Sequence, residues 1–84
     1  MSYVIRILPR AGRELNRLTP QVFGEVAISI AGLGEDPRPH GSRKLVGRDG
    51  WRIRVGRYRV IYEIDDAQRF VTILHVGHRK DIYR

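Results

Sequence analysis

The residues best suited to chemistry in this 84-residue chain are arginines that alternate with apolar side chains in its second half. Arg52 and Arg54 flank Ile53. Successive side chains of a β-strand point to opposite faces, so these two guanidiniums would project from one face, about 6.5–7 Å apart. Arg59 follows across a short turn, and Arg79 comes after the next apolar stretch. A guanidinium fork matches phosphate oxygens bidentately and stays protonated, so the set indicates a phosphate ligand.

Such an arginine cluster suits cleavage of an RNA phosphodiester without a metal ion. The 2′-hydroxyl can attack its own adjacent phosphate, and guanidiniums aimed at that phosphate stabilise the charge that develops, usually the largest catalytic effect. Proton transfer by a positioned side chain adds about 10²–10⁴-fold, and the candidates for it are Tyr83 and His78. Tyr83 could also stack on an unpaired base. Lys44, His78 and Lys80 are further candidates for substrate binding.

The same residues also have structural interpretations, which the sequence leaves open. Arg52 and Arg54 could form the solvated side of an edge strand. Arg59 lies among apolar neighbours, where a buried ion pair with Glu63 or Asp81 would equally account for it.

The possible acid–base groups have structural interpretations too. Tyr83 could pack its ring on the last strand, and His78 could be an ordinary surface histidine. His75 sits between Leu74 and Val76 in an apolar run, so we expect it to be structural.

Metal-dependent chemistry is a weaker alternative. His40, His75 and His78 lack the spacing with carboxylates that is typical of zinc or two-metal sites. Asp65 and Asp66 fall in a predicted turn, where aspartate commonly hydrogen-bonds the backbone. The chain has no cysteine, no glycine-rich phosphate loop and no convincing Ser–His–Asp order. We therefore expect no metal and no cofactor.

These side chains must be positioned by one small α+β domain, because 84 residues hold a single core. Two helices joined by a short turn should form an antiparallel hairpin that covers one face of an antiparallel β-meander and buries Trp51, Ile53 and Val55. The arginines would then lie on the other face, ahead of a short polar C-terminal tail. The predicted order is strand, two helices, loop and three or four strands, at residues 3–8, 10–18, 20–33, 35–42, 44–47, 51–55, 58–64 and 69–76, of which 44–47 is the optional brief strand.

The charge distribution favours a polyanionic partner. Sixteen basic residues against nine acidic ones give a net charge of +7, and fourteen of the sixteen are arginine. Residues 1–42 carry five basic and four acidic side chains, whereas residues 43–84 carry eleven and five. Nucleic acid is favoured over an acidic protein partner or a basic surface kept for solubility. Without cysteine, a signal-peptide pattern or a long apolar run, we expect a cytoplasmic protein.

Four motifs resemble those of the RelE toxins of the RelE/ParE superfamily: KLVG at 44–47, WRIRVG at 51–56, YRVIYEI at 58–64 and VGHRKDIYR at 76–84. The N-terminal strand and helix hairpin agree, so the resemblance implies one RelE-like domain over residues 1–84. It further implies a type II toxin–antitoxin toxin that enters the ribosomal A site and cleaves mRNA there. A cognate RelB-like antitoxin would neutralise it, with a monomeric free toxin and a hetero-oligomeric complex.

The resemblance also assigns roles to individual residues. Arg59 falls at the arginine that stabilises the phosphate, Arg79 at one linked to the leaving group, and Tyr83 at a tyrosine that stacks on or orients the base. Arg52 and Arg54 fall where the best-studied members carry lysines, one of which is implicated in taking the 2′-hydroxyl proton. Arginine effectively cannot share a proton near neutral pH. This departure shifts the proton-transfer role towards Tyr83 or His78, or implies slower cleavage. Related toxins use histidine or glutamate for this role, so cleavage does not require the lysine.

Two other functions remain open from the sequence. A ParE-type toxin, which poisons DNA gyrase, would have the same fold, so fold cannot separate it from a RelE-type toxin. The joint presence of Arg59, Arg79 and Tyr83 favours the RelE type. A catalytically inactive module that binds RNA or antitoxin would use the basic face electrostatically, with steep salt dependence and no cleavage.

Overall fold

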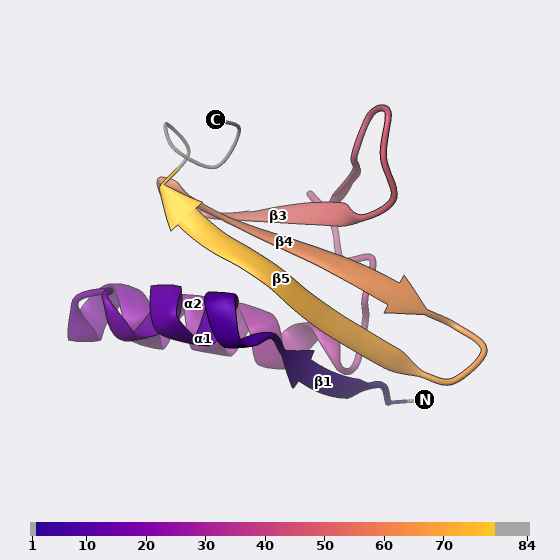
Figure 1. The fold of residues 1–84 in the computed structure, drawn as a ribbon, viewed down its shortest axis with the longest axis horizontal. Coiled ribbons are helices and arrows are strands. Elements are labelled where there is room, and N and C mark those ends of the chain that lie inside the picture. The colour runs from indigo at the N-terminus through magenta and orange to yellow at the C-terminus, as the bar shows by residue number, and fades with distance from the viewer. Residues whose placement is uncertain (1, 79–84) are drawn as a thin grey trace.

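The computed structural model describes residues 2–78 and contains a five-stranded mixed sheet with two helices against one of its faces (Figure 1). The strands lie in the order β1-β5-β4-β3-β2. Strands β3, β4 and β5 form the predicted antiparallel meander, and β1 pairs in parallel with β5. The predicted α+β class is confirmed. The elements are β1 Val4–Ile7, α1 Pro9–Asn16, α2 Pro20–Leu33, β2 Arg43–Lys44, β3 Trp51–Val55, β4 Tyr58–Asp65 and β5 Phe70–His78.

Two strand ends differ from the prediction by more than one residue, each for a local reason. The strand expected at 44–47 is only the two-residue β2, because the chain turns at Gly47, which adopts a left-handed φ of 76°. Strand β5 continues past residue 76, since Gly77 pairs with Arg59 and His78 pairs with Tyr58. The first two residues of the predicted tail therefore belong to the sheet.

Prolines and a threonine determine where the helices begin. Pro9 starts α1 and Pro20 starts α2, at positions where the missing N–H has no helical partner in any case. Thr19 caps α2, its hydroxyl accepting a hydrogen bond from the N–H of Val22 at 3.5 Å. Within residues 2–78, neither helix is long and apolar enough to cross a membrane.

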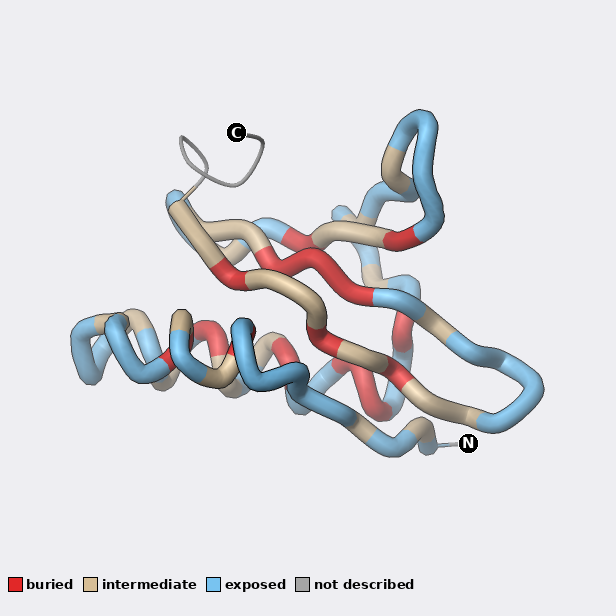
Figure 2. The backbone as a smooth tube through the Cα atoms, in the orientation of Figure 1, coloured by how far each residue is buried: buried red, intermediate tan, exposed pale blue. Residues whose placement is uncertain are grey.

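The hydrophobic core lies between the helices and the sheet face that they cover. Figure 2 shows buried positions in the strands of the meander and in both helices. Trp51, Ile53 and Val55 all pack towards this core, but only Ile53 is buried, whereas Trp51 and Val55 are half-buried. The buried core residues are Ala11, Leu15, Val26, Ile30, Leu33, Ile53, Val60, Tyr62, Val71, Ile73 and Val76.

An exposed cluster of polar side chains ties the β4–β5 turn to more distant parts of the chain. Arg38 donates to both carboxylate oxygens of Asp66, at 2.8 and 3.3 Å, and the Tyr3 hydroxyl donates to one of them at 2.6 Å. The hydrogen bond from Arg38 has the largest effect and that from Tyr3 the next, and together they lower the pKa of Asp66 to about 2. Asp65 accepts a hydrogen bond from the N–H of Gln68 at 2.9 Å. Both aspartates thus serve the turn.

We expect Asp66→Asn to remove a stabilisation that depends on pH. The pKa of Asp66 is about 2 in the folded protein, against an ordinary 3.8. Its ionised form therefore stabilises the fold above about pH 4, and this contribution is lost as the pH falls towards about 2. The difference in free energy of unfolding between wild type and variant, measured by urea denaturation, should shrink over that range. Because Asp66 is exposed, high salt should shrink it as well. A difference independent of pH would contradict this assignment.

Candidate active site

One row of facing residues brings two of the predicted site arginines together on the uncovered face of the sheet. Arg54 of β3 pairs with Arg59 of β4, and Arg59 pairs with Gly77 of β5. The alternate residues Ile53 and Val60 are in the core, so this row points away from the helices. Two guanidiniums that face each other across neighbouring strands offer donors and positive charge that suit an anionic ligand.

A second row lies beside the first on the same face. Arg43 of β2 pairs with Arg52 of β3, Arg52 with Ile61 of β4, and Ile61 with His75 of β5. The register thus places Arg52 on the same face as Arg54 and Arg59, as their alternation in the sequence predicts. We call the surface formed by Arg43, Arg52, Arg54 and Arg59 the arginine face.

The arginines of this face differ in exposure. Arg54 is exposed, whereas Arg52 and Arg59 are half-buried, and the Nε atom of Arg59 is buried. A half-buried guanidinium stem has fewer rotamers available, so less conformational entropy is lost when the head group binds a ligand. Arg59 is therefore well suited to hold a phosphate in one position.

A hollow of about 350 Å³ adjoins the arginine face. Part of it is formed by the segment between β2 and β3, which rises from the sheet in Figure 1. Ile61 is buried although it lies outside the main core, and Val46 is almost fully exposed. Apolar side chains ringed by cations suit a nucleotide, whose base is flat and whose phosphate is negative. The lining residues are Arg43, Lys44, Leu45, Val46, Arg48, Arg52 and Ile61.

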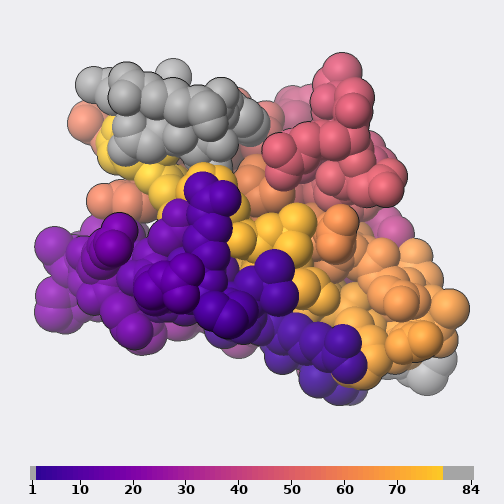
Figure 3. All heavy atoms as spheres, viewed as in Figure 1, coloured from indigo at the N-terminus to yellow at the C-terminus, as the bar shows by residue number. Residues whose placement is uncertain are grey.

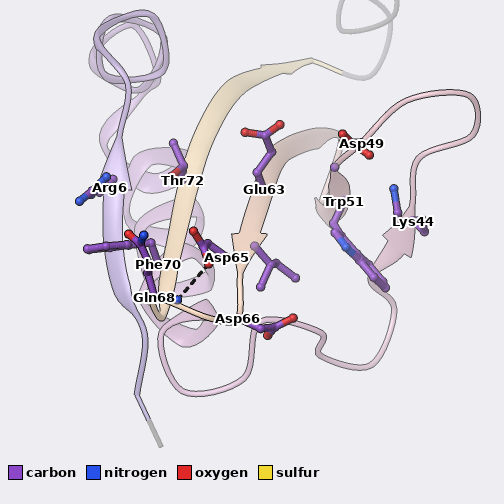
Figure 4. A pocket seen from close by; sticks show the side chains of 12 residues that line it. Arg6, Lys44, Asp49, Trp51, Glu63, Asp65, Asp66, Gln68, Phe70 and Thr72 are labelled. Atoms are coloured by element: carbon purple, nitrogen blue, oxygen red, sulfur yellow. Dashed lines mark hydrogen bonds between the residues drawn. The ribbon is translucent and has the colours of Figure 1, made fainter.

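A larger hollow, of about 500 Å³, lies at the other end of the sheet (Figure 4). Its lining includes the carboxylates of Asp49, Glu63, Asp65 and Asp66, which would repel a phosphate. In the part of the chain that the structure describes, no three histidine, aspartate or glutamate side chains are arranged to hold a metal ion. The candidate site is therefore the arginine face rather than this larger hollow.

His78, a sequence candidate for proton transfer and substrate binding, does not lie with the arginines. It pairs with Tyr58, and the two rings meet edge to face with centroids 5.5 Å apart. Tyr58 pairs in turn with Val55, which packs against the core. His78 therefore belongs to the row on the helix side of the sheet.

Of the remaining predicted site residues, only Lys44 lies in the described part of the chain. Arg79, Lys80 and Tyr83 lie outside the described residues, so their roles stay predictions. Lys44 lies in the edge strand β2, and its Nζ donates to the carbonyl oxygen of Arg48 at 3.2 Å. It lines both hollows and so borders the arginine face.

Sequence reasoning missed Arg43 and His75, which complete the second row. Arg43 precedes the predicted strand at 44–47, and only its pairing with Arg52 brings it to the site. His75 was expected to be structural, yet its ring lies between two polar side chains of α1, Arg10 and Glu14. A contact between residues more than 60 positions apart leaves no local signal in the sequence.

Comparison with known proteins gives matches over nearly the whole chain. The family model for the ParE toxin of the type II toxin–antitoxin system parDE matches residues 5–83. The chain is 38% identical over 88 residues to Toxin RelG of Mycobacterium tuberculosis, covering 100% of this chain and 99% of that protein. It is 32% identical to Toxin RelE of the same organism, covering 98% and 87% respectively.

Among solved structures, the chain is similar to the toxin–antitoxin complex RelBE2 from Mycobacterium tuberculosis. The TM-score is 0.83 and the identity 33%, with 96% of this chain and 95% of the matched chain covered. The likeness thus includes the helices and β1 as well as the strands that carry the arginine face.

Proposed function

This chain belongs to the RelE/ParE toxin family of type II toxin–antitoxin systems, and we propose that it halts translation by cutting mRNA on the ribosome. The arginine face carries this proposal. Arg52, Arg54 and Arg59 project from one side of β3 and β4, beside a hollow whose charged residues are all cations. That surface matches the charge and shape of an RNA backbone with an unstacked base.

In the proposed reaction the 2′-oxygen of one nucleotide attacks its adjacent phosphorus. The bond from phosphorus to the 5′-oxygen of the next nucleotide breaks, giving a 2′,3′-cyclic phosphate and a 5′-hydroxyl. Arg59 stabilises the charge on the phosphate as it reacts, and Arg52 and Arg54 hold the backbone. We extend to Arg79 and Tyr83 the roles that the family resemblance implies, on the leaving group and the base. Neither a metal nor another cofactor takes part.

Poisoning of DNA gyrase is the second candidate, because the family model that matches residues 5–83 describes a ParE toxin. The relatives with 38% and 32% identity are named RelG and RelE, which favours the RelE type. A gyrase poison also has no need of an arginine pair that opposes like charges across two strands.

Mapping of RNA ends separates the two candidates. After induction in cells, we expect new 5′ ends within the translated region of a reporter transcript. These ends should disappear when translation initiation on that transcript is blocked. Chromosomal DNA should stay intact. DNA double-strand breaks with unchanged mRNA ends would instead establish the gyrase-type activity. Unchanged mRNA and intact DNA would point to an inactive binding module.

We also propose a cognate RelB-like antitoxin as the partner. The RelBE2 structure is a toxin–antitoxin complex, and the net charge of +7 favours an acidic partner or one with an acidic amphipathic helix. The toxin would be monomeric when free and hetero-oligomeric with its antitoxin. Its site of action would be the cytoplasm, where ribosomes translate.

A further inference from the structure

His75 lies close to the arginine face although its neighbours in the sequence are apolar. It pairs with Ile61, and Arg59 pairs with Gly77, two residues further along β5. Arg59 and His75 are therefore diagonal neighbours on one face, a relation in which Cα atoms are about 7–8 Å apart and long side chains can meet. Gly77, directly opposite Arg59, adds no side chain to the space between them.

The contacts of His75 determine which of its ring nitrogens carries the proton. Nδ1 lies 2.7 Å from Oε2 of Glu14, and both side chains are largely buried, at 17% and 18% exposure. Nε2 lies 3.4 Å from Nη2 of Arg10. A carboxylate only accepts and a guanidinium only donates. These two partners favour the tautomer with the proton on Nδ1 and a lone pair on Nε2.

Glu14 is itself held in place by the edge of the sheet. Strand β1 pairs with β5 only as far as Ile73, and beyond that point Oε1 of Glu14 accepts a hydrogen bond from the N–H of Val76 at 2.9 Å. Partial burial raises the pKa of Glu14, but the hydrogen bonds from Val76 and His75 outweigh it, so the pKa is lowered. The carboxylate is thus ionised at neutral pH. Figure 3 shows the atoms of α1 lying directly against β5.

A carboxylate that fixes Nδ1–H and leaves Nε2 as an acceptor is the arrangement of a histidine general base. The site needs such a group, because Arg52 and Arg54 cannot share a proton near neutral pH. The contact of Arg10 with Nε2 is long, and Arg10 is exposed. A substrate hydroxyl can therefore replace it.

We propose that His75 is the general base of the RNA-cleavage reaction and that Glu14 is its positioning residue, an inference that rests on the proposed function. Nε2 takes the proton from the 2′-hydroxyl while the 2′-oxygen bonds to phosphorus and the bond to the 5′-oxygen breaks. The departing 5′-oxygen takes a proton from solvent, and the imidazolium later returns its proton to solvent. Arg10 turns from Nε2 towards the phosphate.

The test is single-turnover cleavage of a ribosome-bound mRNA by wild type, His75→Ala and His75→Gln. Each variant should cleave about 10²-fold more slowly, with mRNA-dependent binding to the ribosome unchanged. Glutamine can still donate to Glu14 but cannot accept the proton, so His75→Gln keeps the fold and loses the rate. Added imidazole should restore part of the rate to His75→Ala and none to Arg59→Ala.

Glu14→Gln tests the positioning role, with Glu25→Gln on the exposed side of α2 as its control. We expect about a tenfold loss of rate for Glu14→Gln and none for Glu25→Gln. A wild-type rate in His75→Gln, or a slow His75→Ala that imidazole leaves unchanged, would overturn the inference. Failure of the proposed function is a separate result, since wild type would then cleave nothing.

Discussion

Arg59→Ala should abolish toxicity and slow mRNA cleavage by about 10²–10³-fold, the usual effect of removing one donor aimed at a reacting oxyanion. Arg59 lies in the central strand of the meander, half-buried and directly opposite Arg54. Its removal takes away the proposed phosphate ligand of β4. The substitution also removes one of two like charges that face each other across β3 and β4. Growth after induction and single-turnover cleavage measure the effect, and thermal unfolding measures the stability.

Arg57→Ala is the matched control for this prediction. Arg57 lies in the turn between β3 and β4, is exposed, and carries the same charge two residues away. We expect the Arg57→Ala protein to remain toxic. Arg59→Lys should fall between wild type and Arg59→Ala, because lysine keeps the charge but not the bidentate fork. Full toxicity of Arg59→Ala, or an equal loss in both alanine variants, would reject Arg59 as a specific phosphate ligand.

Tyr62→Ala should destabilise the protein by about 3–5 kcal/mol, the usual cost of deleting a large buried ring. Tyr62 is fully buried, and its hydroxyl donates to the carbonyl oxygen of Pro37 at 2.7 Å. Burial raises its pKa to about 12, so the hydroxyl keeps its proton at neutral pH. Because small domains are stable by only about 5–15 kcal/mol in total, much of the folded population should be lost at growth temperature. Urea denaturation measures the effect.

Tyr62→Phe separates packing from the hydrogen bond. It keeps the ring but leaves the Pro37 carbonyl without its donor, at a cost of about 1–3 kcal/mol. Val46→Ala, at an almost fully exposed position, should change stability by less than about 0.5 kcal/mol. Tyr62 points to the opposite side of β4 from Arg59, so Tyr62→Phe should keep its cleavage rate. A loss below about 1 kcal/mol in Tyr62→Ala would show that the ring does not support the core.

The meander could be predicted because its signals are local. Alternation in residues 51–55 puts Ile53 in the core and Arg52 and Arg54 outside, and short turns join neighbouring strands. The parallel pair of β1 and β5 joins Val4 to Phe70. No local periodicity reports a pairing across 66 positions, so the mixed character of the sheet was not predictable.

An irregularity in β5 explains why the sequence did not place His75 beside the arginines. Tyr62 pairs with Ile73 but Ile61 pairs with His75, so Leu74 is an extra residue in β5. Strict alternation from Ile73 would have sent residue 75 towards the core. The extra residue reverses the phase, so Val76 is buried instead and His75 comes out on the arginine face. Such a shift depends on pairing and cannot be read from one strand.

In the proposed reaction, an RNA 2′-hydroxyl attacks a phosphate bound by the arginine face. Substitution of a single sugar tests this step directly. In a translation reaction, the toxin is given an mRNA with one 2′-deoxynucleotide immediately 5′ of the mapped cut. We predict that this linkage resists cleavage, whereas the all-ribose mRNA yields a 2′,3′-cyclic phosphate (or 3′-phosphate) and a 5′-hydroxyl. Cleavage of the deoxy-substituted linkage at the ribose rate would contradict it.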